Sequence, residues 1–221
     1  MIKSKSYYCF IFAMYEEAKT TIKNLNFQLL EKEPFEIYKK NDYYIVISKI
    51  GLINAATCFS YINTKYNFDY YINIGTACGV DKTTSIFEFF FIKKAFLGNV
   101  DATGFGYKFG QVPQMPEHYS SVNLLDKSLF NYKEVDICSS DIFINSNEKV
   151  NNVVYKIDKT IKLVDMESAA LFQSAYLMQK NILSIKIISD IVGSNSNELD
   201  FNSVLKDCSE RIYQLIKKFN I

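Results

Sequence analysis

Three side chains that many enzymes depend on are nearly missing from the 221-residue sequence. Tryptophan is absent, His118 is the one histidine and Arg211 is the one arginine. A single histidine excludes a histidine-rich metal site and any Ser-His-Asp nucleophile arrangement that does not use His118. A single arginine leaves at most one bidentate guanidinium clamp for a phosphate group.

Long apolar runs are missing too, since no stretch reaches the roughly 18 apolar residues of a membrane-spanning helix. The run Tyr7–Met14 follows Lys3 and Lys5, as the core of a secretory signal would. It is short, however, has no A-x-A-type end and stops at Glu16 and Glu17. We therefore expect a buried first strand here.

The composition is otherwise that of a globular protein, with 48% hydrophobic residues, 22% charged residues and a net charge of +1. This balance excludes a disordered tail, a collagen and a coiled coil, and it argues against nucleic-acid binding through a basic face. The five cysteines lie far apart without a C-x-x-C pair, which indicates reduced thiols in a cytoplasmic protein. We expect one domain over residues 1–221, with one sizeable core.

Short apolar runs alternate with helical patterns, which predicts an α/β layer architecture. The expected strands are Tyr7–Met14, Tyr43–Ile50, Tyr70–Ile74, Phe87–Ile92, Val135–Cys138 and Ile182–Ile188. The expected helices are Glu16–Leu25, Ile53–Lys65, Glu167–Gln179 and Phe201–Phe219. Ligands of such folds usually bind at the carboxyl ends of the strands, so the segments that follow strands are the places to look for chemistry.

Carboxylates stand at three of these positions. Glu16 and Glu17 follow the first strand, where they either favour the positive end of a helix dipole or take part in chemistry. Glu167 opens an apolar helix, either as an ordinary N-terminal charge or as a holder of two hydroxyl groups. Asp190 follows the most apolar strand, where it either caps the next turn or serves as a general acid.

Three loops offer further candidates. Asn73–Gly79 ends a strand with small residues, which suits either a close ligand approach or a tight turn. Gly104–Gly110 holds three glycines among aromatic residues without the spacing of a dinucleotide site, and is either a flap, a subunit contact or a plain surface loop. In Ser139–Asn145, Asp141 supplies a carboxylate, and Phe143 either stacks on a flat ring or packs in the core.

The order of these segments carries more information than any one of them. The sequence resembles the 5′-methylthioadenosine/S-adenosylhomocysteine nucleosidases of the purine nucleoside phosphorylase superfamily, from about residue 8 to the C-terminus. The segments that carry the resemblance are Ala13–Glu17, Asn73–Gly79, Asp101–Pro113, Ser140–Asn145, Asp165–Ala169 and Ile188–Asp190.

The resemblance implies a central twisted mixed β-sheet flanked by helices, in a homodimer. It implies hydrolysis of the N-glycosidic bond of the small-molecule nucleosides 5′-methylthioadenosine and S-adenosylhomocysteine, which releases adenine and a 5-thioribose sugar in methionine salvage. It implies no cofactor, no metal, no nucleic-acid partner and no membrane association.

Site residues follow from the same resemblance. Asp190 would protonate N7 of adenine and Glu17 would activate the attacking water. Glu167 would hold the ribose hydroxyls, Met166 would lie against the sugar and Phe143 would stack on adenine.

The remaining expected site residues line the walls around these groups. The backbone of Ile144 would read the adenine edge, and the other residues of the chain's own binding set are Met14, Ile50, Thr76, Ala77, Asp165, Ser189 and Phe201. Of these, Met14, Ile50 and Phe201 would form the alkylthio pocket. The partner subunit's Phe105 and Pro113 would complete it.

Departures from the family pattern sharpen the expectation. Asn73 stands where phosphorylases of this fold have an arginine, so water is the expected nucleophile. Lys186 replaces an arginine four residues before Asp190, Thr76 replaces a serine and Cys78 replaces a glycine. We expect an active but divergent enzyme. The alternatives are a hydrolase of another adenine nucleoside (aminodeoxyfutalosine or 5′-deoxyadenosine), a phosphorylase, and a non-catalytic nucleoside-binding relative.

Overall fold

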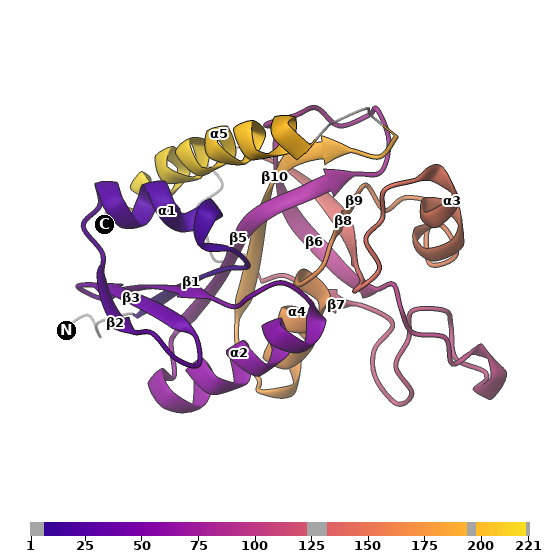
Figure 1. Cartoon of the computed structure of the whole chain (residues 1–221). Coiled ribbons are helices and arrows are strands. Elements are labelled where there is room, and N and C mark those ends of the chain that lie inside the picture. The colour runs from indigo at the N-terminus through magenta and orange to yellow at the C-terminus, as the bar shows by residue number, and fades with distance from the viewer. Residues whose placement is uncertain (1–6, 123–131, 194–197, 220–221) are drawn as a thin grey trace.

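The structure is a computed structural model that describes residues 7–122, 132–193 and 198–219, and Figure 1 shows its mixed sheet between helices. The strands are β1 (Tyr8–Phe12), β2 (Gln28–Glu31), β3 (Glu36–Lys40), β4 (Tyr43–Ile47), β5 (Tyr70–Gly79), β6 (Phe89–Leu97), β7 (Tyr119–Ser120), β8 (Lys133–Ser139), β9 (Leu163–Asp165) and β10 (Ile182–Ile191). The helices are α1 (Tyr15–Asn24), α2 (Leu52–Tyr66), η1 (Thr103–Phe105), α3 (Asn147–Lys149), η2 (Val150–Val154), α4 (Ser168–Leu177) and α5 (Glu198–Lys217).

The strands form one mixed sheet that partly closes on itself. Its order is β10-β6-β8-β9-β5-β1-β4-β3-β2, and β10 also pairs with β5, so that five strands complete a ring. The pairs β5–β10, β1–β5, β1–β4, β6–β8 and β8–β9 are parallel, whereas β6–β10 and β5–β9 are antiparallel. The sheet is therefore mixed, as expected.

Strand β1 is apolar on successive residues because both faces of the sheet are covered. Cys9 and Ile11 pack into one hydrophobic cluster, and Phe10 and Phe12 pack into another on the opposite face. Alternate residues of a strand point to opposite faces, so a strand between two helical layers needs an unbroken apolar run. The expected buried first strand is confirmed.

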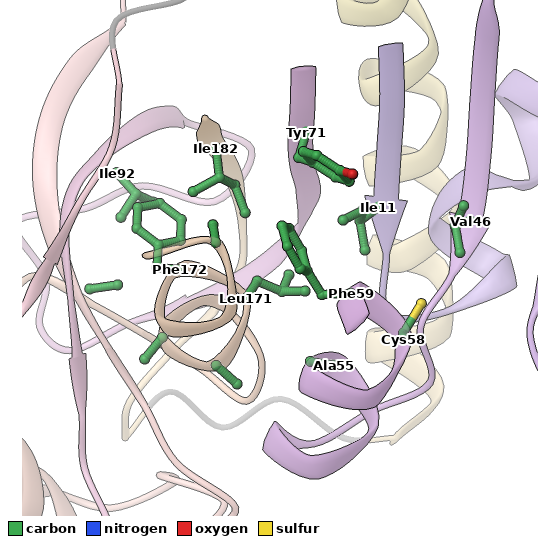
Figure 2. Packing of buried hydrophobic residues seen from close by; sticks show 14 of the residues in the cluster. Ile11, Val46, Ala55, Cys58, Phe59, Tyr71, Ile92, Leu171, Phe172 and Ile182 are labelled. Atoms are coloured by element: carbon green, nitrogen blue, oxygen red, sulfur yellow. The ribbon is translucent and has the colours of Figure 1, made fainter. Parts of the chain in front are cut away.

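Two pairs of helices cover the two faces (Figure 1). Helices α2 and α4 pack together below the sheet, and Figure 2 shows Phe59 of α2 beside Leu171 of α4 against strand residues that include Tyr71. Helices α1 and α5 cover the other face, where Ile22 and Ile212 pack against β1 and β10. Among the helices in the described parts of the chain, none is long and apolar enough to cross a bilayer.

The structure confirms the six expected strands and four expected helices in position, but two strands extend further than predicted. β5 continues to Gly79, so Asn73–Gly79 is not a tight turn. β10 continues to Ile191, so Asp190 lies inside a strand. The two strands pair in parallel over this whole stretch, and this long-range pairing overrides the low strand preference of small residues.

Candidate active site

A cavity of about 640 Å³ opens at the carboxyl ends of β1, β5, β8, β9 and β10. Its walls come from segments that are far apart in the sequence but follow, or end, neighbouring strands. They are Ala13, Met14, Glu17, Ile50, Thr76, Ala77, Cys78, Ile142, Phe143, Ile144, Asn145, Val164, Asp165, Met166, Glu167, Ser189, Asp190, Ile191, Val192 and Gly193. Strand ends are where ligands bind in α/β folds, so the sheet places a site here.

Glu17 is fixed in the first turn of α1, with 1% of its surface exposed. Its Oε1 accepts hydrogen bonds from the backbone N–H of Thr76 (2.7 Å) and from the Thr76 hydroxyl (2.8 Å). Its Oε2 accepts one from the backbone N–H of Met14 (3.2 Å). A Cβ on Gly75 would lie 2.9 Å from Oε1, so the glycine lets β5 approach the carboxylate. The orientation of the Glu17 carboxylate at the cavity wall is thus fixed by contacts within the chain.

A buried ion pair joins the lining residue Asp165 to Lys186, which does not line the cavity. Lys186 Nζ is 2.9 Å from Asp165 Oδ2, and each side chain is 2% exposed. The hydroxyls of Ser139 and Ser168 also donate to the Asp165 carboxylate, each at 2.5 Å. Burial favours a neutral Asp165, but Lys186 and the two serines outweigh it and lower its pKa. Burial likewise works against the charge of Lys186, but the Asp165 and Glu167 carboxylates outweigh it and raise its pKa.

Glu167 stands at the N-terminus of α4 and is 6% exposed. Its Oε1 accepts a hydrogen bond of 2.9 Å from the backbone N–H of Gly51. Burial, followed by the nearby Asp165 charge, raises the pKa of Glu167 to about 7, while Lys186 and the Gly51 N–H oppose the rise. This carboxyl group therefore changes charge near neutral pH.

Asp190 faces the same cavity from β10, next to an irregularity in the β5–β10 register. It is partly exposed, and its Oδ1 accepts a hydrogen bond of 2.6 Å from the Ser189 hydroxyl. Cys78 of β5 is its neighbour across the strand pair. Burial, followed by the Asp190 charge, raises the pKa of the Cys78 thiol, so this cysteine stays protonated.

The segment 142–144 adds aromatic and apolar side chains to the cavity lining. Phe143 is 61% exposed and lines the cavity, whereas its neighbour Ile144 is buried. Lys149 Nζ donates to the backbone carbonyl of Phe143 (2.8 Å) and to Oδ1 of Asn145 (2.9 Å), which ties the loop to α3. Phe143 is not packed in the core, so the alternative of a core phenylalanine is wrong.

Nearly all the expected site residues lie together. Those that line the cavity are Met14, Glu17, Ile50, Thr76, Ala77, Phe143, Ile144, Asp165, Met166, Glu167, Ser189 and Asp190. The side chain of Phe201 lies outside the described residues. Phe105 and Pro113 are exposed and do not line the cavity of their own chain. Figure 1 shows the segment around η1 extending away from the sheet.

Sequence reasoning missed the partners that hold these groups. Lys186 was noticed as a departure, but its ion pair with Asp165 was not predicted. The backbone amide of Gly51 carries no signal in the sequence that it would bind Glu167 from 116 positions away. Only the fold brings these groups together.

The arrangement can stabilise charge separation in a bound ligand. Glu17 and Glu167 lie near one another in the cavity wall, and Asp190 and the aromatic Phe143 line the same cavity. Ionised carboxylates stabilise positive charge that develops on a bound ligand, and a carboxylic acid close to a bound aromatic ring can protonate that ring. Among the described residues, no three metal-ligating side chains are grouped as a metal site would require.

Known proteins share this architecture. The family model of the phosphorylase superfamily matches residues 8–220. The 5′-methylthioadenosine/S-adenosylhomocysteine nucleosidase of Lysinibacillus sphaericus is 30% identical over 190 residues, 82% of each chain. The nucleosidase of the same name from Staphylococcus epidermidis is 28% identical over 198 residues, 84% of this chain and 86% of the relative.

A solved structure agrees in fold. The nucleosidase of Colwellia psychrerythraea, in complex with adenine, superimposes with a TM-score of 0.88 at 23% identity, over 97% of this chain and 94% of that chain. At this identity the likeness shows the fold. Together with the family model and the sequence relatives, it means that the chain belongs to the phosphorylase superfamily and, within it, to the 5′-methylthioadenosine/S-adenosylhomocysteine nucleosidases.

Proposed function

We propose that the protein hydrolyses the N-glycosidic bond of 5′-methylthioadenosine and of S-adenosylhomocysteine, releasing adenine and a 5-thioribose sugar. The relatives named above carry this activity in their names. The observation that carries the proposal is that Glu17, Glu167 and Asp190, from three separate elements, line one cavity together with Phe143.

Asp190 acts on the leaving base. Cleavage of the bond between C1′ and N9 leaves negative charge on adenine, which a proton delivered to N7 neutralises. Asp190, Phe143 and Ile144 line the same cavity, which supports an arrangement in which the purine stacks on Phe143, the backbone of Ile144 reads its edge and Asp190 reaches N7. Proton transfer of this kind contributes about 10²–10⁴-fold to the rate.

Glu17 and Glu167 act on the sugar. Glu17 accepts hydrogen bonds from Thr76 and Met14, which orient its carboxylate to take a proton from the attacking water. Glu167, once ionised, accepts hydrogen bonds from the ribose hydroxyls, and Met166 lies against the sugar. Both charges stabilise the positive ribose of the transition state, and neither needs to reorient during the reaction.

The lining of the cavity favours water over phosphate as the nucleophile. Among the described residues that line it, there is no arginine and no lysine. The guanidinium of Arg211 lies 4.5 Å from the ring centre of Phe87 on α5's side of the sheet. Lys186 is buried and forms an ion pair with Asp165. A phosphate trianion or dianion would therefore lack the cations that usually hold it.

Exposed apolar side chains on η1, α2 and α4 support a homodimer. Phe105 is 85% exposed, and it belongs to the segment that extends from the sheet (Figure 1). Ile53 of α2 and Tyr176 and Leu177 of α4 are 77%, 54% and 61% exposed on neighbouring helices. Large exposed apolar groups mark protein interfaces. A second copy would cover them and bring the partner subunit's Phe105 and Pro113 to the alkylthio pocket, for which Met14 and Ile50 line the cavity.

The proposal also includes a cytoplasmic location and a role in methionine salvage. The five cysteines are all free and buried, as suits a reducing cytoplasm. A 5-thioribose product keeps its sulfur, which supports a role of the reaction in methionine salvage.

Adenine release tests the function. The purified protein is incubated with 5′-methylthioadenosine, S-adenosylhomocysteine, aminodeoxyfutalosine or 5′-deoxyadenosine, each with and without phosphate. Release from the two thioether nucleosides without phosphate is expected. Release only with phosphate would identify a phosphorylase, release from the other nucleosides alone would identify a different hydrolase, and binding without release would identify a non-catalytic relative.

A further inference from the structure

The loop that carries Phe143 is held from two sides. On one side Lys149 donates to the Phe143 carbonyl, at 2.8 Å. On the other side Asp141 Oδ1 accepts a hydrogen bond of 2.8 Å from the backbone N–H of Leu52. Leu52 is the first residue of α2 and lies 89 positions away in the sequence. The second contact therefore joins the loop to a different layer of the fold.

The start of α2 binds two carboxylates side by side. The N–H of Gly51 donates to Glu167, and the N–H of Leu52 donates to Asp141. The first N–H groups of a helix have no partner within the helix, and the dipole of this 15-residue helix favours negative charge at that end. No side chain of α2 itself caps these groups.

Gly51 makes the double contact possible. Its φ is +103°, a conformation that residues with a Cβ rarely adopt, and a Cβ here would lie 3.1 Å from Asp141 Oδ1. The glycine thus gives the chain its turn into α2 and leaves room for the Asp141 carboxylate.

We infer that Asp141 is a positioning residue for the substrate base. It fixes the Phe143 loop to the same helix end that holds Glu167, and so sets the stacking ring at a defined place relative to the ribose-binding carboxylate. Asp141 does not line the cavity, and it acts through Phe143. The inference rests on the proposed function, in which Phe143 stacks on adenine and Glu167 binds the ribose.

The test compares three variants. Asp141→Ala removes the acceptor, Asp141→Asn keeps an acceptor oxygen without the charge, and Asp158→Ala is the matched control. Asp158 accepts hydrogen bonds from the Thr160 N–H and hydroxyl, at 2.8 Å each, and does not line the cavity. Steady-state kinetics with 5′-methylthioadenosine and calorimetric titration with adenine are measured for each.

Asp141→Ala is expected to raise KM and the adenine Kd about tenfold, with kcat within about threefold of wild type, because stacking binds ground state and transition state alike. Asp141→Asn is expected to stay within about threefold in all three quantities. Asp158→Ala is expected to leave them unchanged. If Asp141→Ala does not fold, Asp141→Glu replaces it, with the same increase in KM expected because the longer side chain displaces the loop.

A lower melting temperature with unchanged KM and adenine Kd would overturn the inference, since Asp141 would then only cap α2. Equal effects of Asp141→Ala and Asp141→Asn would also overturn it. If the wild type binds adenine but hydrolyses no nucleoside, the proposed function fails, and the adenine Kd values still decide the role of Asp141. If it does not bind adenine, both fail.

Discussion

The ribose end and the base end of the cavity are built in different ways. At the ribose end Glu17 and Glu167 are 1% and 6% exposed, and each accepts hydrogen bonds from the backbone. At the base end Phe143 is 61% exposed, and its neighbour in the loop, Ile142, is 43% exposed. The charged groups are fixed before substrate arrives, whereas the apolar walls bury their surface only when a ligand or a second subunit covers them.

This difference follows from what each end must do. Charges that stabilise a transition state act best when they do not have to reorient, so they need partners within the chain. Apolar side chains in the wall contribute to binding when the ligand covers them. The apolar surface that they expose in the free protein is therefore the surface whose burial favours binding. Substitutions at the two ends should therefore change different quantities.

The largest effect is expected from Asp190→Asn, which removes the proton donor. The rate constant kcat for adenine release should fall by roughly 10³-fold, because an amide cannot protonate the base. The melting temperature should stay close to that of wild type, since Asp190 is partly exposed and an amide still accepts a hydrogen bond from Ser189. Asp207→Asn, an exposed acid on α5, is the control. A kcat near that of wild type would reject Asp190 as the acid.

Lys186→Met tests the charge that is buried behind the ribose end. Removing one partner of a buried ion pair leaves Asp165 uncompensated, and the free energy of unfolding should fall by about 3–5 kcal/mol. Lys162→Met is matched to it, because Lys162 pairs with Asp81 at 3.4 Å on the surface, where such a loss costs less than about 1 kcal/mol. Denaturant unfolding measures both. Equal losses would mean that the ion pair at the ribose end contributes no more than a surface pair.

The pH dependence of kcat/KM reports on Glu167. Its pKa of about 7 means that the carboxyl takes up a proton as the pH falls through neutrality, and it then loses an acceptor for the ribose hydroxyls. We therefore expect kcat/KM for 5′-methylthioadenosine to fall on the acid side of about pH 7. Glu167→Gln should lower kcat/KM and abolish this limb. A limb that persists unchanged in this variant would assign it to another group.

The smallest effect is expected from Phe105→Ala, in the segment proposed to reach the partner subunit's cavity. Because Phe105 is 85% exposed within its own chain, the melting temperature of the isolated chain has little reason to change. The KM for 5′-methylthioadenosine should rise about tenfold or less if the ring completes the partner's pocket. Leu30→Ala, at an exposed apolar residue of β2, should leave KM unchanged. No change in KM for Phe105→Ala would remove the ring from the pocket.

The sequence predicted the layers better than it predicted the contacts within the site. Alternation of apolar runs with helical patterns located β1 and α2 to within a few residues, because burial on both faces leaves a continuous apolar run. The ends of β5 and β10 were placed too early, since residues such as Thr76, Ala77 and Ser189 have little strand signal, and these ends extend as strands because they pair with each other and, for β5, with β9.

The candidate site shows the same limit. Glu17 and Asp190 were found because they follow apolar strands and because the family resemblance assigns them roles. The pairing of Lys186 with Asp165 and the hydrogen bond from Leu52 to Asp141 join residues 21 and 89 positions apart. The local sequence pattern around each residue carries no information about such contacts, because residues this far apart in the sequence meet only once the whole chain has folded.

The most direct test of the central claim follows the oxygen that joins C1′ of the sugar. Hydrolysis of 5′-methylthioadenosine in water labelled with a heavy oxygen isotope, with phosphate also present, is analysed by mass spectrometry of the sugar product. The account predicts a free sugar that carries one heavy oxygen, formed at the same rate with and without phosphate. A sugar phosphate without the label would contradict it.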